Sequence, residues 1–382
     1  MRIAIVCSNY LNMGKETASG TGIFNYSFIS ELVKHAENDL LSITAFASGA
    51  SQLPVQIESI DYEPSSANDQ LSASGKFVLY EQALIAKAFA MQDRFDLYHI
   101  NIGDGDIALP FSPFVKRPIL ITLHHILDTD YMRTFFSFYK NVQHVRFVSA
   151  SNAQRKLLPD LNYAATIYHG VDPALFAFNT DGGASLMWAG RVIPEKGPDI
   201  VVDIAQQIGC AAKLFGIPRK QHQKWFETNV LDKINESRGA ITYEAGLDRY
   251  QLVDHYQSSK AFVLPIVYEE SFGLVLIEAM SCGTPVIAFA RGSIPEIIED
   301  GKTGFIVNAA DDDIRGDWIV KKTGGAGLRE AVERIYAMPP TEYAAMRAAC
   351  RDRVLRYFTI KRMVDEYLHV YKESCEISTL NH

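Results

Sequence analysis

Short apolar runs alternate with longer amphipathic stretches along nearly the whole chain. Apolar runs bounded by turn residues are typical of buried strands, and stretches with apolar residues three or four apart are typical of covering helices. This alternation predicts an α/β fold with parallel sheets and crossover helices. In the first half it places strands at residues 3–7, 42–46, 97–101, 119–123 and 144–148, and helices at 22–35 and 81–91.

The alternation is interrupted at residues 170–183, where glycine, proline and aspartate accumulate as in a hinge. We therefore expect two facing Rossmann-like domains with a ligand cleft between them, because open parallel sheets bind ligands beyond the carboxyl ends of their strands. The expected division is 1–172, 173–358 and a C-terminal helix at 359–382 that packs back toward the first domain. The second series of strands falls at 185–191, 212–217, 241–246, 261–266, 284–290 and 303–308.

Composition narrows the functional class. The chain has 382 residues, which favours two domains, and its 37 basic against 45 acidic residues give a net charge of −8. That balance argues against a general affinity for nucleic acid or anionic lipid. The first residues read as a strand rather than a signal peptide, and the apolar runs are too short to span a membrane. We expect a cytoplasmic protein whose five scattered cysteines are reduced.

The loop after the first predicted strand is rich in glycine. Gly20 and Gly22 open the next helix, where free N–H groups can bind an anion. The loop is longer than a dinucleotide-binding turn, and Asn25 stands where the third glycine of GxGxxG belongs, so a nicotinamide cofactor is not expected. The alternative interpretation is a flexible surface loop.

Polar residues also follow two later strands of the first half. Asn101 and Asp104 come after one strand, and His124 and His125 come after the next. Adjacent residues at a strand end point in different directions, so we expect at most one of the two histidines to face the cleft. A histidine in such a place is more often structural than catalytic.

The first strand of the second half leads into "AGRVIPEKG", where Arg191 follows the strand and Lys196 precedes a helix. Two cations beside a glycine turn and a helix N-terminus suit a diphosphate group. The alternative is a pair of solvated surface cations.

Two acids frame the apolar stretch "ESFGLVLIE". Glu270 precedes a predicted helix, and Glu278 lies eight residues later, roughly 12 Å along the helix axis. This distance suits contacts with a donor hexose and with a ribose on either side of a diphosphate. The alternative is that both are ordinary helix acids. The apolar neighbours of Glu278 argue against that alternative, because a buried acid needs a partner.

These motifs together resemble the family 4 retaining glycosyltransferases of the two-domain (GT-B) type. The likeness extends over nearly the whole chain and includes the spaced acids, "AGRVIPEKG", "AMSCGTPVIA", "HGVD" and the glycine-rich first loop. It implies transfer of a hexose from a nucleotide-diphosphate sugar, with UDP-glucose and GDP-mannose as the leading donors. No cofactor and no metal are expected, and the first domain would bind the acceptor and the second the donor.

The resemblance also implies roles for individual residues. Arg191 and Lys196 would neutralise the departing diphosphate, Glu270 would contact the donor sugar, and His124 would lie near the donor sugar and the acceptor. The acceptor-binding candidates are Asn101, Asp104 and His125. The donor-binding candidates are Gly20, Gly22, Ser271, Phe272, Gly273, Leu274, Val275 and Glu278.

The chain departs from the family pattern at several points. It has "GTG" in the first loop, His169 at the hinge, "LFGIPRK" in place of a glycine-rich acidic turn, and a long segment at 311–327 interpreted as a surface insertion. The expected acceptor is a sugar, a lipid-linked saccharide or a small molecule, and peripheral membrane contact stays open. The alternative functions are a nucleotide-sugar epimerase and a non-catalytic nucleotide-sugar-binding protein on the same fold.

Overall fold

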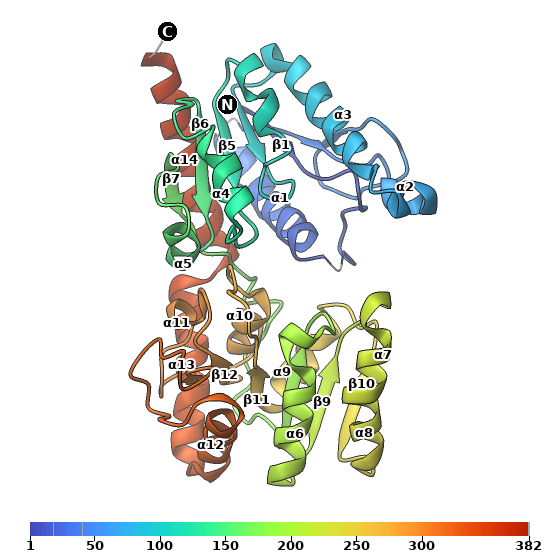
Figure 1. Ribbon diagram of the computed structural model, residues 1–382. Coiled ribbons are helices and arrows are strands. Elements are labelled where there is room, and N and C mark those ends of the chain that lie inside the picture. The colour runs from blue at the N-terminus through green and yellow to red at the C-terminus, as the bar shows by residue number, and fades with distance from the viewer. Residues whose placement is uncertain (18, 40, 381–382) are drawn as a thin grey trace. The chain divides into compact units, whose positions relative to one another are not determined.

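The computed structural model describes residues 1–17, 19–39 and 41–380, with side chains described except at 36–39 and 378–380. The chain forms two compact units (Figure 1). Unit 1 comprises Met1–His169 and Ile360–His382, and unit 2 comprises Gly170–Thr359. The C-terminal helix therefore belongs to unit 1. The expected roles of the two domains in acceptor and donor binding stay predictions.

Unit 1 is built on a seven-stranded sheet in the order β3-β2-β1-β4-β5-β6-β7 with parallel pairing between neighbours. The five strands expected here are present within one or two residues, whereas the edge strands β3 and β7 were not predicted. Both are short and only partly buried, so they lack a long apolar run. The strands are β1 (Arg2–Val6), β2 (Ser42–Phe46), β3 (Gln56–Glu58), β4 (Leu97–Ile100), β5 (Ile119–Thr122), β6 (Val145–Ser149) and β7 (Tyr163–Thr166).

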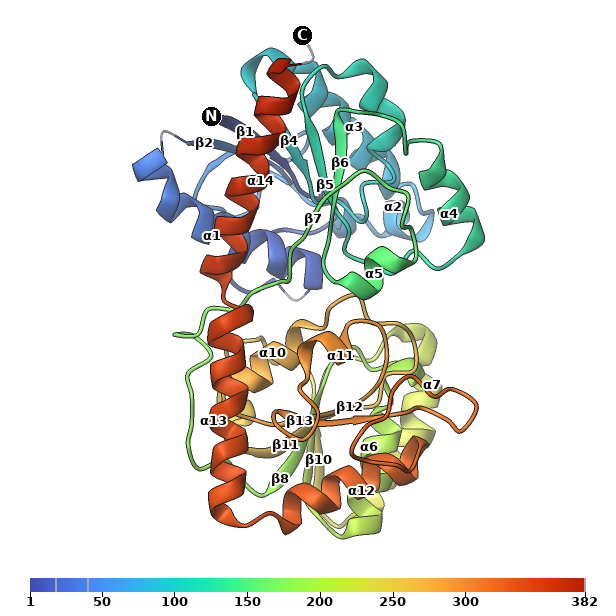
Figure 2. The ribbon, with the colours of Figure 1, turned by 90° about the vertical axis from the view of Figure 1, so that its left-hand side faces the viewer.

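Helices cover both faces of this sheet. On one face α1 lies beside the C-terminal helix α14 (Figure 2), and Phe28 and Tyr367 are buried there together. The hydroxyl groups of Tyr367 and Tyr371 reach Thr122 Oγ1 (2.8 Å) and His99 Nδ1 (2.5 Å), so α14 is joined to the sheet by buried hydrogen bonds. The helices are α1 (Gly20–Asp39), α2 (Asp69–Ala73), α3 (Phe77–Ala90), α4 (Asp130–Ser137), α5 (Asn152–Lys156) and α14 (Ile360–Leu380).

Unit 2 repeats the design with a six-stranded parallel sheet in the order β10-β9-β8-β11-β12-β13. All six strands lie where the hydrophobic pattern places them, within one or two residues. They are β8 (Ser185–Ala189), β9 (Ala212–Phe215), β10 (Ile241–Glu244), β11 (Ser259–Leu264), β12 (Val286–Phe289) and β13 (Gly304–Val307).

The helices of unit 2 include two, α6 and α10, that begin close to predicted site residues. Among the described residues no helix is both long enough and apolar enough to cross a membrane. The helices are α6 (Pro198–Ile208), α7 (Gln223–Phe226), α8 (Asp232–Glu236), α9 (Leu252–Gln257), α10 (Leu274–Ser281), α11 (Ile294–Ile297), α12 (Gly324–Ala337) and α13 (Pro340–Tyr357).

Candidate functional site

The loop after β8 carries the two predicted cations of unit 2. Arg191 is exposed two residues beyond the end of the strand, and Lys196 closes a short 3-10 helix, η4 (Pro194–Lys196). Gly197 follows with φ 62°, a left-handed conformation that favours glycine, and α6 then begins at Pro198. The turn thus brings Lys196 back toward the end of the sheet.

Lys196 lies beside Glu270. Its Nζ is 3.8 Å from Glu270 Oε2, and the two side chains are 12% and 13% exposed. Burial lowers the pKa of Lys196, the neighbouring Glu270 opposes that shift, and Arg191 adds to it. The same ammonium lies 5.9 Å from the ring centre of Tyr268, whose pKa is raised mainly by burial. Three of the predicted catalytic residues therefore form one charged cluster in unit 2.

Two backbone features hold the Lys196 turn against the loop that carries Glu270. The N–H of Val267 donates to the carbonyl of Glu195 (3.0 Å). A Cβ on Gly197 would lie 2.7 Å from Cγ of Pro265, so only glycine permits this approach. These contacts join the loops after β8 and β11, which carry Lys196 and Glu270.

The residues after Glu270 lead into α10 through a fixed turn. Gly273 has φ 89° and directly precedes the helix at Leu274. Phe272 is buried, and its carbonyl accepts a hydrogen bond from Ser293 Oγ (2.8 Å). The predicted donor-binding residues 271–275 therefore form the N-terminal end of α10, where backbone N–H groups favour a negative charge.

Glu278 is buried inside unit 2, as its apolar neighbours indicate. Its Oε1 lies 2.8 Å from Nη2 of Arg249, and its Oε2 accepts a hydrogen bond from the hydroxyl of Tyr256 (3.2 Å). The guanidinium also lies 5.1 Å from the ring centre of Phe176. Sequence reasoning missed Arg249: a buried acid predicts a cation, but the sequence alone does not single out one arginine.

In unit 1 the predicted polar residues also come together. Asp104 is buried, and its Oδ1 accepts the backbone N–H groups of His124 and His125, both at 2.8 Å. Its Oδ2 lies 2.9 Å from Nδ1 of His125. Burial alone would raise the pKa of Asp104, but the contacts with His125 lower it overall. This carboxylate therefore fixes the loop after β5.

The two adjacent histidines point differently, as expected. The side chain of His125 is 64% exposed, whereas the ring of His124 lies inward, with Nε2 3.4 Å from Asn101 Oδ1. Burial lowers the pKa of His124 to about 3, and His169 contributes to the shift. His124 is therefore a neutral imidazole near pH 7, able to donate from one nitrogen and accept at the other.

The glycines of the first loop differ in their surroundings. Among the described residues, no atom lies within 4 Å of a Cβ placed on Gly20, whereas a Cβ on Gly22 would lie 2.3 Å from Cγ2 of Thr17 and 2.7 Å from Oγ of Ser19. That hydroxyl accepts the N–H of Gly22 (3.1 Å) at the start of α1. Gly22 is required by packing within the loop, while packing does not explain Gly20.

Comparison with known proteins relates part of unit 2 to a family of transferases. Residues 179–315 match the family model described as glycosyl transferases group 1. The chain is 32% identical over 186 residues to a D-inositol 3-phosphate glycosyltransferase of Mycolicibacterium smegmatis, a match that covers 46% of this chain and 42% of that protein. The chain thus spans less than half the length of this curated relative.

Solved structures resemble the chain over nearly its full length. Sucrose-phosphate synthase from Thermosynechococcus elongatus aligns with a TM-score of 0.74 at 19% identity, covering 97% of this chain and 98% of that one. Anabaena Alr3699/HepE in complex with UDP and glucose aligns with a TM-score of 0.71 at 17% identity, covering 98% and 100%. The expected fold, with two Rossmann-like domains of the GT-B type, is confirmed.

Proposed function

Since the chain contains a group 1 glycosyl transferase domain on a GT-B fold, we propose that it is a family 4 retaining hexosyltransferase that uses a nucleotide-diphosphate sugar. The observation that carries the proposal is the cluster of Arg191, Lys196 and Glu270 beside the N-terminal end of α10. A cationic pair and a helix N-terminus next to a carboxylate match the charges of a diphosphate joined to a sugar.

In this proposal the cations act on the leaving group. Arg191 and Lys196 stabilise the negative charge that develops on the diphosphate, which is the work a divalent metal performs in other transferases. The lowered pKa of Lys196 reflects its burial, and the neighbouring carboxylate of Glu270 favours the charged ammonium. We therefore propose that transfer needs no metal.

Glu270 and Glu278 are proposed to bind the hydroxyl groups of the hexose and of the ribose. Glu270 is assigned to binding the hexose and not to attack on the anomeric carbon, so we favour a front-face reaction over a double displacement. The acceptor oxygen bonds to the anomeric carbon on the face from which the diphosphate departs, and the acceptor proton passes to a phosphate oxygen of the donor. His124, neutral near pH 7, is proposed to orient the acceptor hydroxyl.

UDP-glucose is the first donor to test, with GDP-mannose second, because a structural neighbour was determined with UDP-glucose. The relative named for D-inositol 3-phosphate makes a small phosphorylated polyol a suitable first acceptor, beside sugars and lipid-linked saccharides. A cytoplasmic location stays a prediction.

The test is transfer from each donor to this acceptor panel in the presence of EDTA, with the anomeric configuration of the product read by NMR. The proposal expects an axial donor linkage to give an axial product linkage. An inverted product would overturn the retaining assignment, and interconversion of donor sugars without an acceptor would indicate an epimerase instead.

A further inference from the structure

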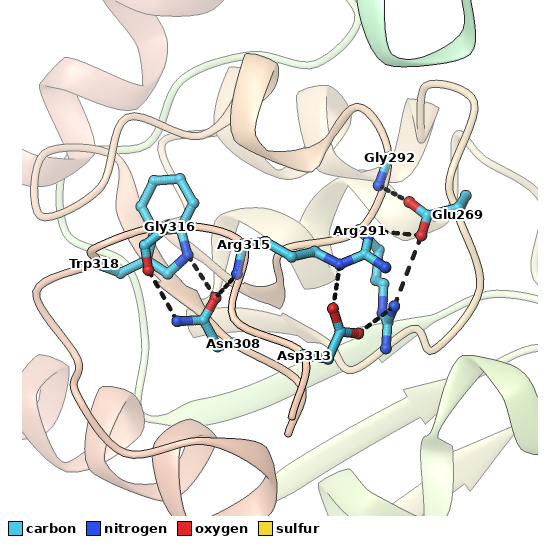
Figure 3. A network of polar contacts seen from close by, with 8 residues as sticks. All are labelled: Glu269, Arg291, Gly292, Asn308, Asp313, Arg315, Gly316 and Trp318. Atoms are coloured by element: carbon cyan, nitrogen blue, oxygen red, sulfur yellow. Dashed lines mark hydrogen bonds and ion pairs between the residues drawn. The ribbon is translucent and has the colours of Figure 1, made fainter. Parts of the chain in front are cut away.

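The segment between β13 and α12, residues 308–323, is held by hydrogen bonds within the segment itself. Oδ1 of Asn308 accepts the backbone N–H of Arg315 (2.8 Å) and the indole N–H of Trp318 (3.1 Å), while Nδ2 of Asn308 donates to the carbonyl of Gly316 (2.9 Å). A Cβ on Gly316 would lie 2.4 Å from Trp318, so the indole packs on this glycine. One asparagine side chain thus fixes the position from which Arg315 extends (Figure 3).

Arg315 reaches from this turn to Glu269, the residue before the predicted catalytic Glu270. Its Nη1 lies 2.5 Å from Oε1 of Glu269, and its Nε lies 2.7 Å from Oδ1 of Asp313. Arg291 completes the group, 2.6 Å from Oδ2 of Asp313 and 3.7 Å from Glu269 (Figure 3). Two carboxylates and two guanidiniums therefore balance each other, and the Arg315 contact lowers the pKa of Asp313.

The other carboxylate oxygen of Glu269 is bound by the turn at residues 292–293, which also binds the backbone of Glu270. The N–H of Gly292 donates to Oε2 of Glu269 (2.5 Å), and the N–H of Ser293 donates to the carbonyl of Glu270 (2.9 Å). A Cβ on Gly292 would lie 2.2 Å from that carbonyl oxygen. The turn at residues 292–293 therefore holds the side chain of Glu269 and the backbone of Glu270 side by side.

We propose that Arg315 is a positioning residue for donor-sugar binding, acting through Glu269 on the orientation of Glu270. The inference rests on the proposed function, which assigns the donor hexose to Glu270. Arg315 and Glu269 are 33% and 26% exposed, so their ion pair contributes little to global stability. Its effect is local: it fixes the backbone from which the 3.8 Å contact between Glu270 and Lys196 is made.

The kinetic test compares Arg315→Ala, Arg315→Lys and Glu269→Ala with the wild type, using the nucleotide sugar that the wild type turns over. Arg315→Ala is expected to raise the KM for the donor about tenfold, because a misplaced Glu270 carboxylate weakens a charge-assisted hydrogen bond to the hexose, while UDP or GDP alone binds within about twofold of the wild type. Arg315→Lys is expected to raise the donor KM less than Arg315→Ala does, because lysine keeps the positive charge. The double variant Arg315→Ala/Glu269→Ala is expected to have a donor KM no higher than that of Glu269→Ala, because Arg315 is proposed to act on the donor site through Glu269.

Lys321→Ala is the matched control, since this cation lies in the same segment and forms an ion pair with the exposed Asp317 (2.5 Å). It should leave the donor KM unchanged. An unchanged donor KM in Arg315→Ala, or an equal loss of affinity for the sugar-free nucleotide, would overturn the positioning role.

Hydrogen exchange provides a readout that needs no activity. In Arg315→Ala, peptides covering residues 267–273 should exchange faster than in the wild type, and peptides from β8 should not change. Faster exchange in a protein that binds no nucleotide sugar would support the positioning of residues 269 and 270 by Arg315 and would refute the proposed function. Unchanged exchange in a protein that does transfer sugar would refute the positioning role of Arg315 and leave the proposed function intact.

Discussion

The guanidinium of Arg249 lies 2.8 Å from the carboxylate of Glu278, and the two side chains are only 10% and 4% exposed. Removing one partner from such a buried pair leaves an unpaired charge, at a cost of about 3 kcal/mol. We therefore expect Arg249→Ala to lower the free energy of unfolding by about that amount in denaturant titrations. The double variant Arg249→Met/Glu278→Leu should regain most of it, because no charge is left buried.

The matched control is Arg334→Ala, which removes a partly exposed ion pair with Glu330 on α12. Its effect should stay below about 1 kcal/mol. If Arg249→Ala and Arg334→Ala lower the free energy of unfolding equally, the buried pair has no special stabilising role.

Lys196 is expected to act on turnover more than on folding. Lys196→Ala should lower kcat by about 10²- to 10³-fold, since one group that stabilises charge in the transition state is lost. Steady-state kinetics with saturating donor measures the effect, and exposed Lys224→Ala is the control. A Lys196→Ala enzyme with near-normal kcat and normal folding would remove this lysine from the proposed mechanism.

Gly20 and Gly22 should respond oppositely to alanine. A Cβ on Gly20 would contact none of the described residues, so Gly20→Ala should fold at least as well as the wild type and gain roughly 0.5 kcal/mol from helix propensity. Gly22→Ala must displace Thr17 and the capping hydroxyl of Ser19, and should lower the melting temperature. If a ligand approaches Gly20, only Gly20→Ala loses transfer activity without losing stability; full activity would argue against that contact.

Three histidines of unit 1 predict a stability that depends on pH. Burial is the main cause that lowers the pKa values of His99, His124 and His169 to about 3. The unfolded chain takes up a proton at each near pH 6.5, whereas the folded chain does not, so folding stability falls as the pH drops from 6.5 toward 3. For the fully buried His99 the loss is about 2 kcal/mol at pH 5.

Calorimetric melting at pH 7.5 and pH 5 tests this dependence. His99→Gln should show a smaller drop between the two pH values than the wild type, while His369→Gln, an exposed position on α14, should not change the drop. A wild-type melting temperature that is the same at both pH values would show that these histidines do not control acid stability.

The sequence predicts the fold well because buried parallel strands are continuous apolar runs. β8 and β12 are buried along their whole length and were placed within two residues, whereas β3, with three partly buried residues, carries no such pattern. The grouping of Lys196 with Glu270 follows from strand order, since β8 and β11 are neighbours in the sheet. Site residues such as Lys196 and Glu270 can therefore be identified from sequence motifs, because they lie in loops that follow predicted strands.

The sequence did not reveal the arginine partners of Glu278 and Glu269, for a physical reason. Arg249 and Arg315 lie 29 and 46 residues from the acids they contact, in loops without a hydrophobic period. Each contact depends on side-chain directions that only the tertiary structure fixes. The segment at 311–327 was interpreted as a surface insertion, and its contact with Glu269 gives it a place beside the site.

The most direct test of the account is calorimetric titration of UDP and GDP into the wild type and into Lys196→Ala, with EDTA throughout. The account predicts that one nucleotide binds the wild type without metal, and that Lys196→Ala binds it at least about tenfold more weakly, because a charge-assisted contact with the diphosphate is lost. Binding that requires a divalent metal, or equal affinity in both proteins, would contradict the assignment of Arg191 and Lys196 to the diphosphate.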